Sequence, residues 1–226
     1  MVPFDREMRF RLPHRWHGGT PKGFSLVELL VVLAITAILA AISVPAISSA
    51  MSFSKLNGAE QAVMGHFSFA RQSALASNRA VEVRFYKISD YKGTLVYGAM
   101  QSFRQDTDVS GNAVSVALSK PYFFPNPIVI VSDASASSLM VPATSGASFL
   151  QSGDAGFDSS HPLPPPHGVR PYTSFCFRPN GQTDLTGTST ITLASEVAPV
   201  VAHSLPANFI TLQIDAVNGT VRVFRP

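Results

Sequence analysis

The chain has 226 residues, of which 46% are hydrophobic and only 14% are charged, a length that suits one membrane-anchored helix and one globular domain with its own core. The formal net charge is +3, and residues 1–23 alone contribute five basic against two acidic side chains, so the rest of the chain is near neutral and its high pI is no sign of nucleic-acid binding. The single cysteine, Cys176, excludes an internal disulfide framework, and we expect it to be a small buried side chain in a strand.

Residues 1–23 are rich in arginine, histidine and proline and show little apolar periodicity. By the positive-inside rule, this basic end of the chain stays in the cytoplasm. The C-terminal part then lies across the inner membrane, in the periplasm or outside the cell. We therefore expect residues 1–23 to be a disposable leader.

Residues 24–44 form a long apolar run in which Glu28 is the only ionisable side chain. A helix rises about 1.5 Å per residue, so about 20 residues cross a hydrocarbon core of roughly 30 Å. The run therefore predicts a transmembrane helix. An acidic side chain within a membrane is costly and indicates a functional site, so Glu28 is expected to need a partner charge.

Three simpler interpretations of this run remain open. An ordinary secretory signal has a shorter apolar core of about 7–15 residues, although the small residues Ser48 to Ala50 resemble its cleavage site. A plain transmembrane anchor explains the length but neither Gly23 nor Glu28. A buried helix of a soluble core is disfavoured because the run is too long and too continuous.

Gly23, Phe24, Glu28 and Pro45 together resemble the class III, or prepilin-type, signal of type IV pilins and of secretion-system pseudopilins. The resemblance implies that a membrane-bound prepilin peptidase cuts after Gly23 and methylates the new N-terminal residue, Phe24. It also implies that Glu28, fifth in the mature chain, neutralises the N-terminal amine of a neighbouring subunit during assembly. In a low dielectric such opposite charges stabilise each other far more than at a surface.

Pro45 lacks a backbone N–H and is expected to bend the helix. Beyond it, apolar residues recur at helical spacing, which predicts an amphipathic helix that packs onto a sheet and ends near Ser77, with Asn78 as its cap. The expected contact residues are Ile47, Met51, Leu56, Ala59, Val63, Phe67, Ala70 and Ala74. The predicted division is a cleaved leader (1–23), a transmembrane and assembly helix (24–51) and an exported domain (52–226).

From Val81 the apolar period changes to two, which indicates a half-buried strand over residues 81–86. Further strands are predicted at 94–103, 114–118, 128–131, 174–178, 190–194, 209–215 and 220–224, and Asn218-Gly219 is a strong hairpin signal between the last two. Residues 132–170, rich in serine, glycine and proline, are expected to form a long exposed loop. A helix followed by strands predicts an α+β fold, in which the long N-terminal helix packs on an antiparallel sheet as in pilins.

Two distal segments narrow the resemblance. The junction at residues 69–81 and the tail from Phe177 to Gly181 are similar to those of the GspH/FimT minor pilins and pseudopilins. More narrowly, residues 81–86, 177–185 and 209–226 resemble the Verru_Chthon cassette protein D family, a pilin-like group. The resemblance implies an exported pilin-like protein without an established activity.

Some FimT-like minor pilins are linked to DNA capture through arginines of the C-terminal hairpin, in a Gly-Arg-x-Arg pattern. Here only Arg222 matches that pattern, with Arg225 further on, so these two residues are the candidate DNA contacts. Losing one basic contact weakens the electrostatic attraction that dominates DNA binding.

Sequence signatures of catalysis and metal binding are missing: the chain has no HExxH, Walker A, GxSxG or paired CxxC motif. Residues 153–158 have a faint calcium-loop spacing but too few ligands, and we expect a solvated loop there. We therefore predict no enzyme activity, cofactor or metal. The predicted function is a minor pilin or pseudopilin-like structural subunit of a type IV pilus or type II secretion-like filament. The alternative is a filament-displayed DNA-binding minor pilin for DNA uptake.

Overall fold

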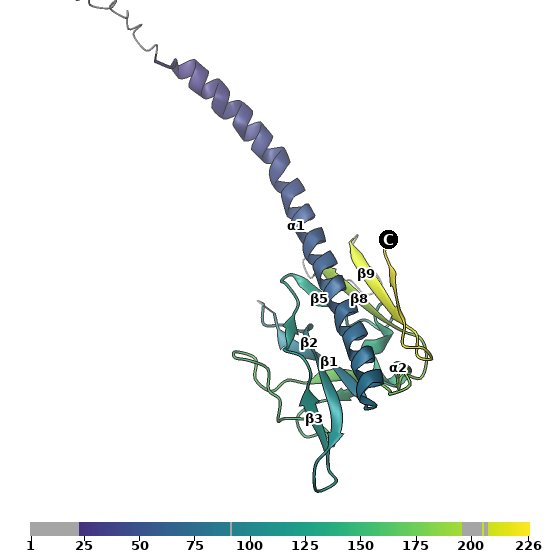
Figure 1. Cartoon of the computed structure of the whole chain (residues 1–226). Coiled ribbons are helices and arrows are strands. Elements are labelled where there is room, and N and C mark those ends of the chain that lie inside the picture. Colours follow the sequence, from purple (N-terminus) through teal and green to yellow (C-terminus); the bar gives the residue numbers. More distant parts are fainter. Residues whose placement is uncertain (1–22, 91, 196–204, 206–207) are drawn as a thin grey trace, which may run out of the picture. The chain divides into compact units, whose positions relative to one another are not determined.

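The computed structural model describes residues 23–226 except 91, 196–204 and 206–207, and the side chains of 44–46 and 144 are also left undescribed. The chain divides into two compact units, residues 1–46 and 47–226. One long helix, α1 (Leu26–Ser77), contributes to both units, and the strands all belong to the second (Figure 1).

The first part of α1 is capped by Ser25. The backbone N–H of Glu28 donates to Ser25 Oγ at 3.1 Å, and the sequence Ser25-Leu26-Val27-Glu28 has the spacing of a capping box. Every described side chain from Phe24 to Ser43 is exposed, although most are apolar. The helix contains a stretch that is long and apolar enough to cross a membrane, as the sequence predicts.

In the second unit, α1 packs on the sheet through one face. Leu56, Ala59, Val63, Phe67, Ala70 and Ala74 are all buried in the main core. Ile47 and Met51 were predicted on this face, but both are exposed, because the packed part of the helix begins beside Lys55, whose Nζ donates to the carbonyl of Asn126 at 2.8 Å. The predicted helix end is confirmed: α1 stops at Ser77, and Asn78 follows with a left-handed φ of 51°.

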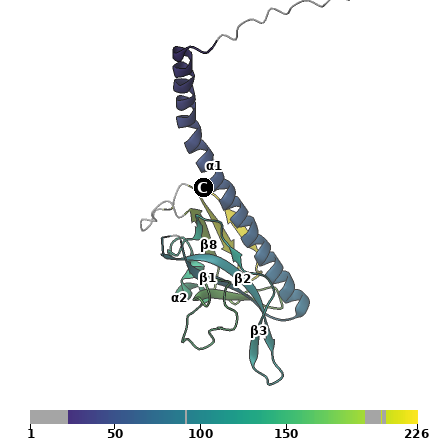
Figure 2. The same cartoon turned by 90° about the vertical axis from the view of Figure 1, so that its left-hand side faces the viewer.

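In the described part of the chain ten strands form one sheet, and every pairing between them is antiparallel, which confirms the predicted α+β fold. The strands are β1 (Val81–Ser89), β2 (Leu95–Thr107), β3 (Ala113–Ala117), β4 (Tyr122–Phe123), β5 (Ile128–Ile130), β6 (Ser148–Leu150), β7 (Tyr172–Phe177), β8 (Ser189–Ser195), β9 (Phe209–Ile214) and β10 (Val221–Phe224). Their order is β10-β9-β8-β5-β2-β1-β7-β6, with β3 and β4 paired to β2. The sequence did not predict the short strands β4 and β6. The hairpin of β2 and β3 projects from the sheet (Figure 2).

Strand β1 is buried on both faces from Val81 to Tyr86, so the prediction of a half-buried strand is wrong. Val83 and Phe85 face the main core beneath α1, whereas Tyr86 belongs to a second apolar cluster with Phe103 and Tyr172. We call the side of the sheet that carries this second cluster the outer face. The alternation is correct, but other parts of the chain cover the polar side.

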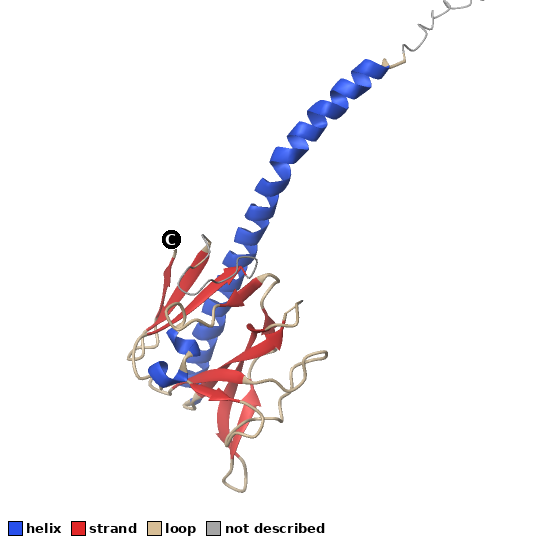
Figure 3. Cartoon of the chain, turned by 180° about the vertical axis from the view of Figure 1, so that it is seen from behind, coloured by secondary structure: helices blue, strands red, loops and turns tan. Residues whose placement is uncertain are grey.

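Residues 132–170 provide much of that cover, so the prediction of a long exposed loop holds only in part: residues 151–156 are exposed, but other parts of the segment are structured or buried. The segment contains a 3-10 turn, η1 (Ser138–Met140), a short helix, α2 (Pro142–Ser145), and strand β6. Leu139 and Met140 enter the main core, and Leu163 enters the outer-face cluster. Figure 3 shows these loops and short elements beside the strands, seen from behind. Side-chain hydroxyl groups hydrogen-bond this segment to strand β8, where a further strand would use backbone hydrogen bonds: Thr192 Oγ1 donates to the carbonyl of Ala136 at 2.6 Å.

Candidate assembly site

Gly23 and Phe24 lie directly before α1. A methyl group at the Gly23 Cα would meet no atom within 4 Å, and the residue does not have a left-handed φ. The fold therefore does not need glycine here. A requirement for a small residue at this position would have to come from a binding partner such as a peptidase.

Glu28 lies in the first turn of α1, where the positive end of the helix dipole favours a carboxylate. Its side chain is exposed and forms no ion pair with any residue that the structure describes. The carboxylate is therefore open to a charge from outside the chain. Pro45 lies within α1 at the boundary between the two units, and the bend expected there stays a prediction.

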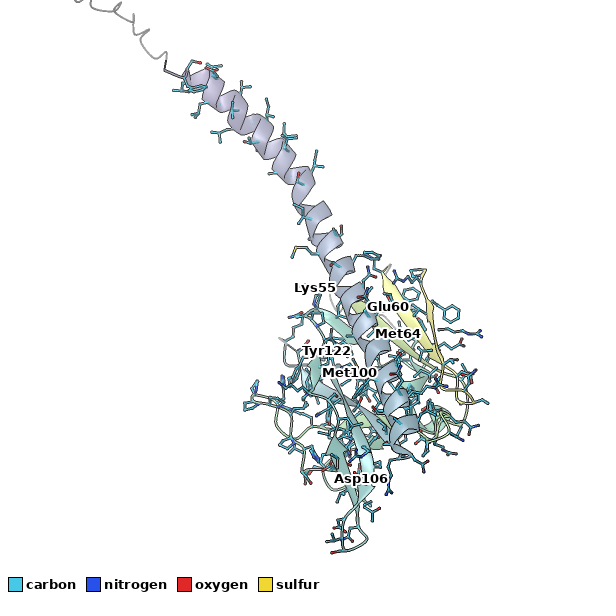
Figure 4. The ribbon with its side chains drawn as sticks, in the orientation of Figure 1. Lys55, Glu60, Met64, Met100, Asp106 and Tyr122 are labelled. Atoms are coloured by element: carbon cyan, nitrogen blue, oxygen red, sulfur yellow. The ribbon has the colours of Figure 1, made fainter. Side chains whose placement is uncertain are left out.

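The C-terminal hairpin of β9 and β10 carries the two candidate DNA contacts. Arg222 is exposed and pairs in register with Gln213, while Arg225 forms an ion pair with Glu60 of α1. In Figure 4 Glu60 lies on the side of α1 next to this hairpin. The Glu60 carboxylate already neutralises Arg225, so Arg222 is the better placed of the two for a phosphate contact.

An ionic cluster on the outer face was not predicted. Arg84 is 2% exposed, and its guanidinium donates to Glu82 Oε2 at 2.7 Å, Asp158 Oδ2 at 2.8 Å and the Ser115 hydroxyl at 2.8 Å. The guanidinium carbon also lies 4.0 Å from the ring centre of Phe103 and 4.7 Å from that of Tyr172. The sequence signal was present, since Glu82 and Arg84 are two residues apart in a strand and must share a face.

Residues 153–158 were expected to form a solvated loop; residues 153–156 are exposed as expected, but the Asp158 side chain is only 13% exposed. Burial raises the pKa of its carboxyl, but hydrogen bonds from Arg84, His161 and the Ser160 backbone, with the charge of Arg84, outweigh burial and hold that pKa well below its usual range. His161 Nδ1 lies 2.9 Å from Asp158 Oδ2. The ion pair fixes the 157–171 segment over the outer face, because its two partners are 74 positions apart in the chain.

Cys176 lies in strand β7 as predicted, but it is only half-buried, and it is a free thiol. Burial, followed by the nearby Asp184 carboxylate, raises the pKa of this thiol, so it is not an activated nucleophile. Among the residues that the structure describes, no group of three histidine, cysteine, aspartate or glutamate side chains is placed to hold a metal ion.

Residues 21–44 match the model of the prokaryotic N-terminal methylation motif. A search of curated proteins found no significant match. One similar solved structure is the type IV minor pilin FimU of Pseudomonas aeruginosa, with 13% identity, a TM-score of 0.43 and an alignment that covers 76% of this chain and 93% of that chain. Another is the minor pseudopilin EpsH of the Vibrio cholerae type 2 secretion system, with 9% identity, a TM-score of 0.42 and an alignment that covers 76% of this chain and 98% of that chain. The chain combines a match to the N-terminal methylation motif with one long helix packed on an antiparallel sheet.

Proposed function

We propose that this chain is a minor pilin or pseudopilin subunit, which a prepilin peptidase cuts between Gly23 and Phe24 and methylates at Phe24. The mature subunit enters a type IV pilus or type II secretion-like filament through its N-terminal helix. Its role is structural and not enzymatic. The narrower membership in the Verru_Chthon cassette protein D family stays a prediction.

One observation carries this proposal: the matched motif at residues 21–44 coincides with an apolar helix whose side chains are exposed among the residues that the structure describes. Exposed leucine, isoleucine and valine side chains surround this stretch, with Leu26 at 80% and Ile42 at 69%. A helix that is apolar all round needs a lipid or protein environment. The inner membrane before assembly, and neighbouring subunits after it, each supply that environment.

Glu28 gives this helix a means of fixing its position in a filament. Cleavage after Gly23 would create a positive amine on Phe24, and the Glu28 carboxylate has no ion-pair partner within the described part of the chain. Pairing the amine of one subunit with Glu28 of another offsets the cost of removing both charges from water. The exported domain, proposed to begin near residue 52, would then lie in the periplasm or outside.

The test is the mass of the mature protein, expressed in a host with a prepilin peptidase. We expect an N-terminus at Phe24 that carries one added methyl group. Gly23→Val should abolish this maturation, while the fold should be unchanged because a side chain at this position meets no other atom. Gly187→Val is a control that should mature normally, because Gly187 is exposed, has no left-handed φ and would place its new Cβ within 4 Å of no other atom. A mature chain that starts at Met51, or an uncut Met1, would contradict the proposal.

DNA uptake is the alternative function, and of its two candidate contacts only Arg222, on an edge strand, forms no ion pair with a described residue. A binder of duplex DNA normally presents a broader basic surface. The ion pair of Arg225 with Glu60 reduces the charge of the hairpin further. We therefore keep the structural role as the proposed function.

A further inference from the structure

The outer face of the sheet is covered over only part of its area. Residues 157–171 cover the aromatic part, where Phe157 stacks on Tyr172 and His161 packs against Phe103. Beside that part lies an open cavity of about 650 Å³, lined by the β2–β3 hairpin, strand β6 and residues 156–161. Its lining includes Glu82, Arg84, Gln105, Ser174, Cys176 and Asp184. A cavity of this size lies within the range of small-ligand pockets.

The charges that line this cavity do not balance. Its carboxylates are Glu82, Asp158 and Asp184, and the one arginine that lines it, Arg84, already pairs with the first two. Asp184 accepts a hydrogen bond from the backbone N–H of Cys176 at 2.8 Å but forms no ion pair with any described residue. Burial raises the pKa of the Asp184 carboxyl and outweighs the hydrogen bonds and the charge of Arg178, which lower it, so these partners do not fully compensate the buried carboxylate.

Two further acceptors face the same space. Ser174, on strand β7, is only 5% exposed and lines the cavity, yet its hydroxyl makes no hydrogen bond to any residue in the described ranges. Glu82 accepts its two hydrogen bonds, from Arg84 and Gln105, on the same oxygen, Oε2. The Ser174 hydroxyl in the cavity wall is therefore available to accept a hydrogen bond from a group that enters the cavity.

We propose that this cavity binds a guanidinium or primary ammonium group, which donates hydrogen bonds to Asp184, Ser174 and the free oxygen of Glu82. Such a group supplies both the missing positive charge and several N–H donors in one head. The carboxylates are not grouped tightly enough to share a metal ion within the described residues. The ligand is either a free small molecule or a basic side chain of another protein, and the proposal does not depend on the filament role.

The test uses the full chain in detergent and follows its thermal unfolding midpoint against the concentration of argininamide. We expect a saturable rise with argininamide and none with citrullinamide, which has the same shape but a neutral urea head. The tripeptide acetyl-Gly-Arg-Gly-amide distinguishes the two sources. If the tripeptide stabilises the protein at least as much as argininamide does, the natural ligand is a side chain of another protein. If the tripeptide stabilises the protein less than argininamide does, the natural ligand is a small molecule.

Variants then locate the binding. Asp184→Asn keeps an oxygen acceptor for the Cys176 N–H but removes the charge, and should weaken argininamide binding about tenfold or more. Asp154→Asn, in a nearby loop but outside the cavity lining, should bind as the wild type does. Ser174→Ala should weaken binding several-fold without altering charge, which keeps the test valid if Asp184→Asn does not fold.

The proposal is wrong if neither arginine probe stabilises the protein, if citrullinamide acts equally well, or if Asp184→Asn and Ser174→Ala both bind argininamide as the wild type does.

Discussion

The buried guanidinium of Arg84 gives the sharpest prediction about stability. Arg84→Met keeps most of the aliphatic volume but removes the charge that holds Glu82 and Asp158 at 2.7 and 2.8 Å. Both carboxylate side chains are largely buried, at 8% and 13% exposure, so they regain only part of their hydration when the guanidinium is removed. The variant should therefore lose the ion pairs and loosen residues 157–171.

The expected loss of folding stability follows from the burial of these two carboxylates. Removing one partner of a buried ion pair destabilises a protein by about 3–5 kcal/mol, because the remaining charge is left without compensation. A loss of 1 kcal/mol lowers the unfolding midpoint by about 2–4 °C in a domain of this size, so Arg84→Met should lower it by roughly 10 °C. Total stability is commonly about 5–15 kcal/mol, so the variant should still fold.

The assay is thermal unfolding of the full chain in mild detergent, followed by near-ultraviolet circular dichroism. Arg104→Met is the matched control, because Arg104 pairs with Asp106 at 2.6 Å but remains 34% exposed. An exposed pair contributes only about 0–1 kcal/mol, so this variant should unfold within a few degrees of the wild type. Equal midpoints for Arg84→Met and Arg104→Met would refute the reasoning that burial makes the Arg84 cluster strong.

Three further predictions concern Glu28, the acid response and the C-terminal hairpin. Glu28→Val and Glu28→Gln should both insert into the membrane but enter filaments poorly, measured by the amount of subunit in sheared filaments. Glu28→Gln keeps the helix-capping ability of the side chain but removes its charge. If Glu28→Gln assembles as the wild type does, capping and not charge matters. The folded-state pKa of Asp158 lies below its unfolded value of about 3.9, so its ion pairs stabilise the fold above that pH and are lost as pH falls through the folded-state value. Asp158→Asn should thus be less stable at neutral pH yet lose less stability on acidification in urea unfolding, and parallel pH curves would contradict this. DNA affinity measured over a salt series should be weak and unchanged by Arg222→Ala or Arg225→Ala. Each phosphate contact adds about 0.9 to the slope of log affinity against log salt concentration. A steep slope that both substitutions flatten would therefore favour DNA binding.

Structural features that depend only on residues close together in the chain were predicted correctly from the sequence. The apolar run with one carboxylate, the end of α1 at Ser77 and the hairpin around Asn218-Gly219 all appear where expected. These features arise from local chemistry: side-chain transfer from water, the left-handed φ of Asn78 and a tight turn. Each can be recognised within a short window of residues.

Features that depend on distant partners were missed. Alternation in β1 correctly predicts which side chains share a face, but it does not reveal that residues 157–171 cover the polar one. Asp158 lies in a serine- and glycine-rich stretch typical of exposed loops, and its burial depends on Arg84, 74 positions earlier in the chain.

The sequence by itself therefore determined the membrane-length helix, its motif and the antiparallel class of the domain. Only the tertiary structure decided which polar side chains became buried, because burial of a charge depends on a compensating partner that no local pattern specifies. The same reason explains why the cavity lined by Ser174 and Asp184 was not predicted: its walls come from segments far apart in the chain.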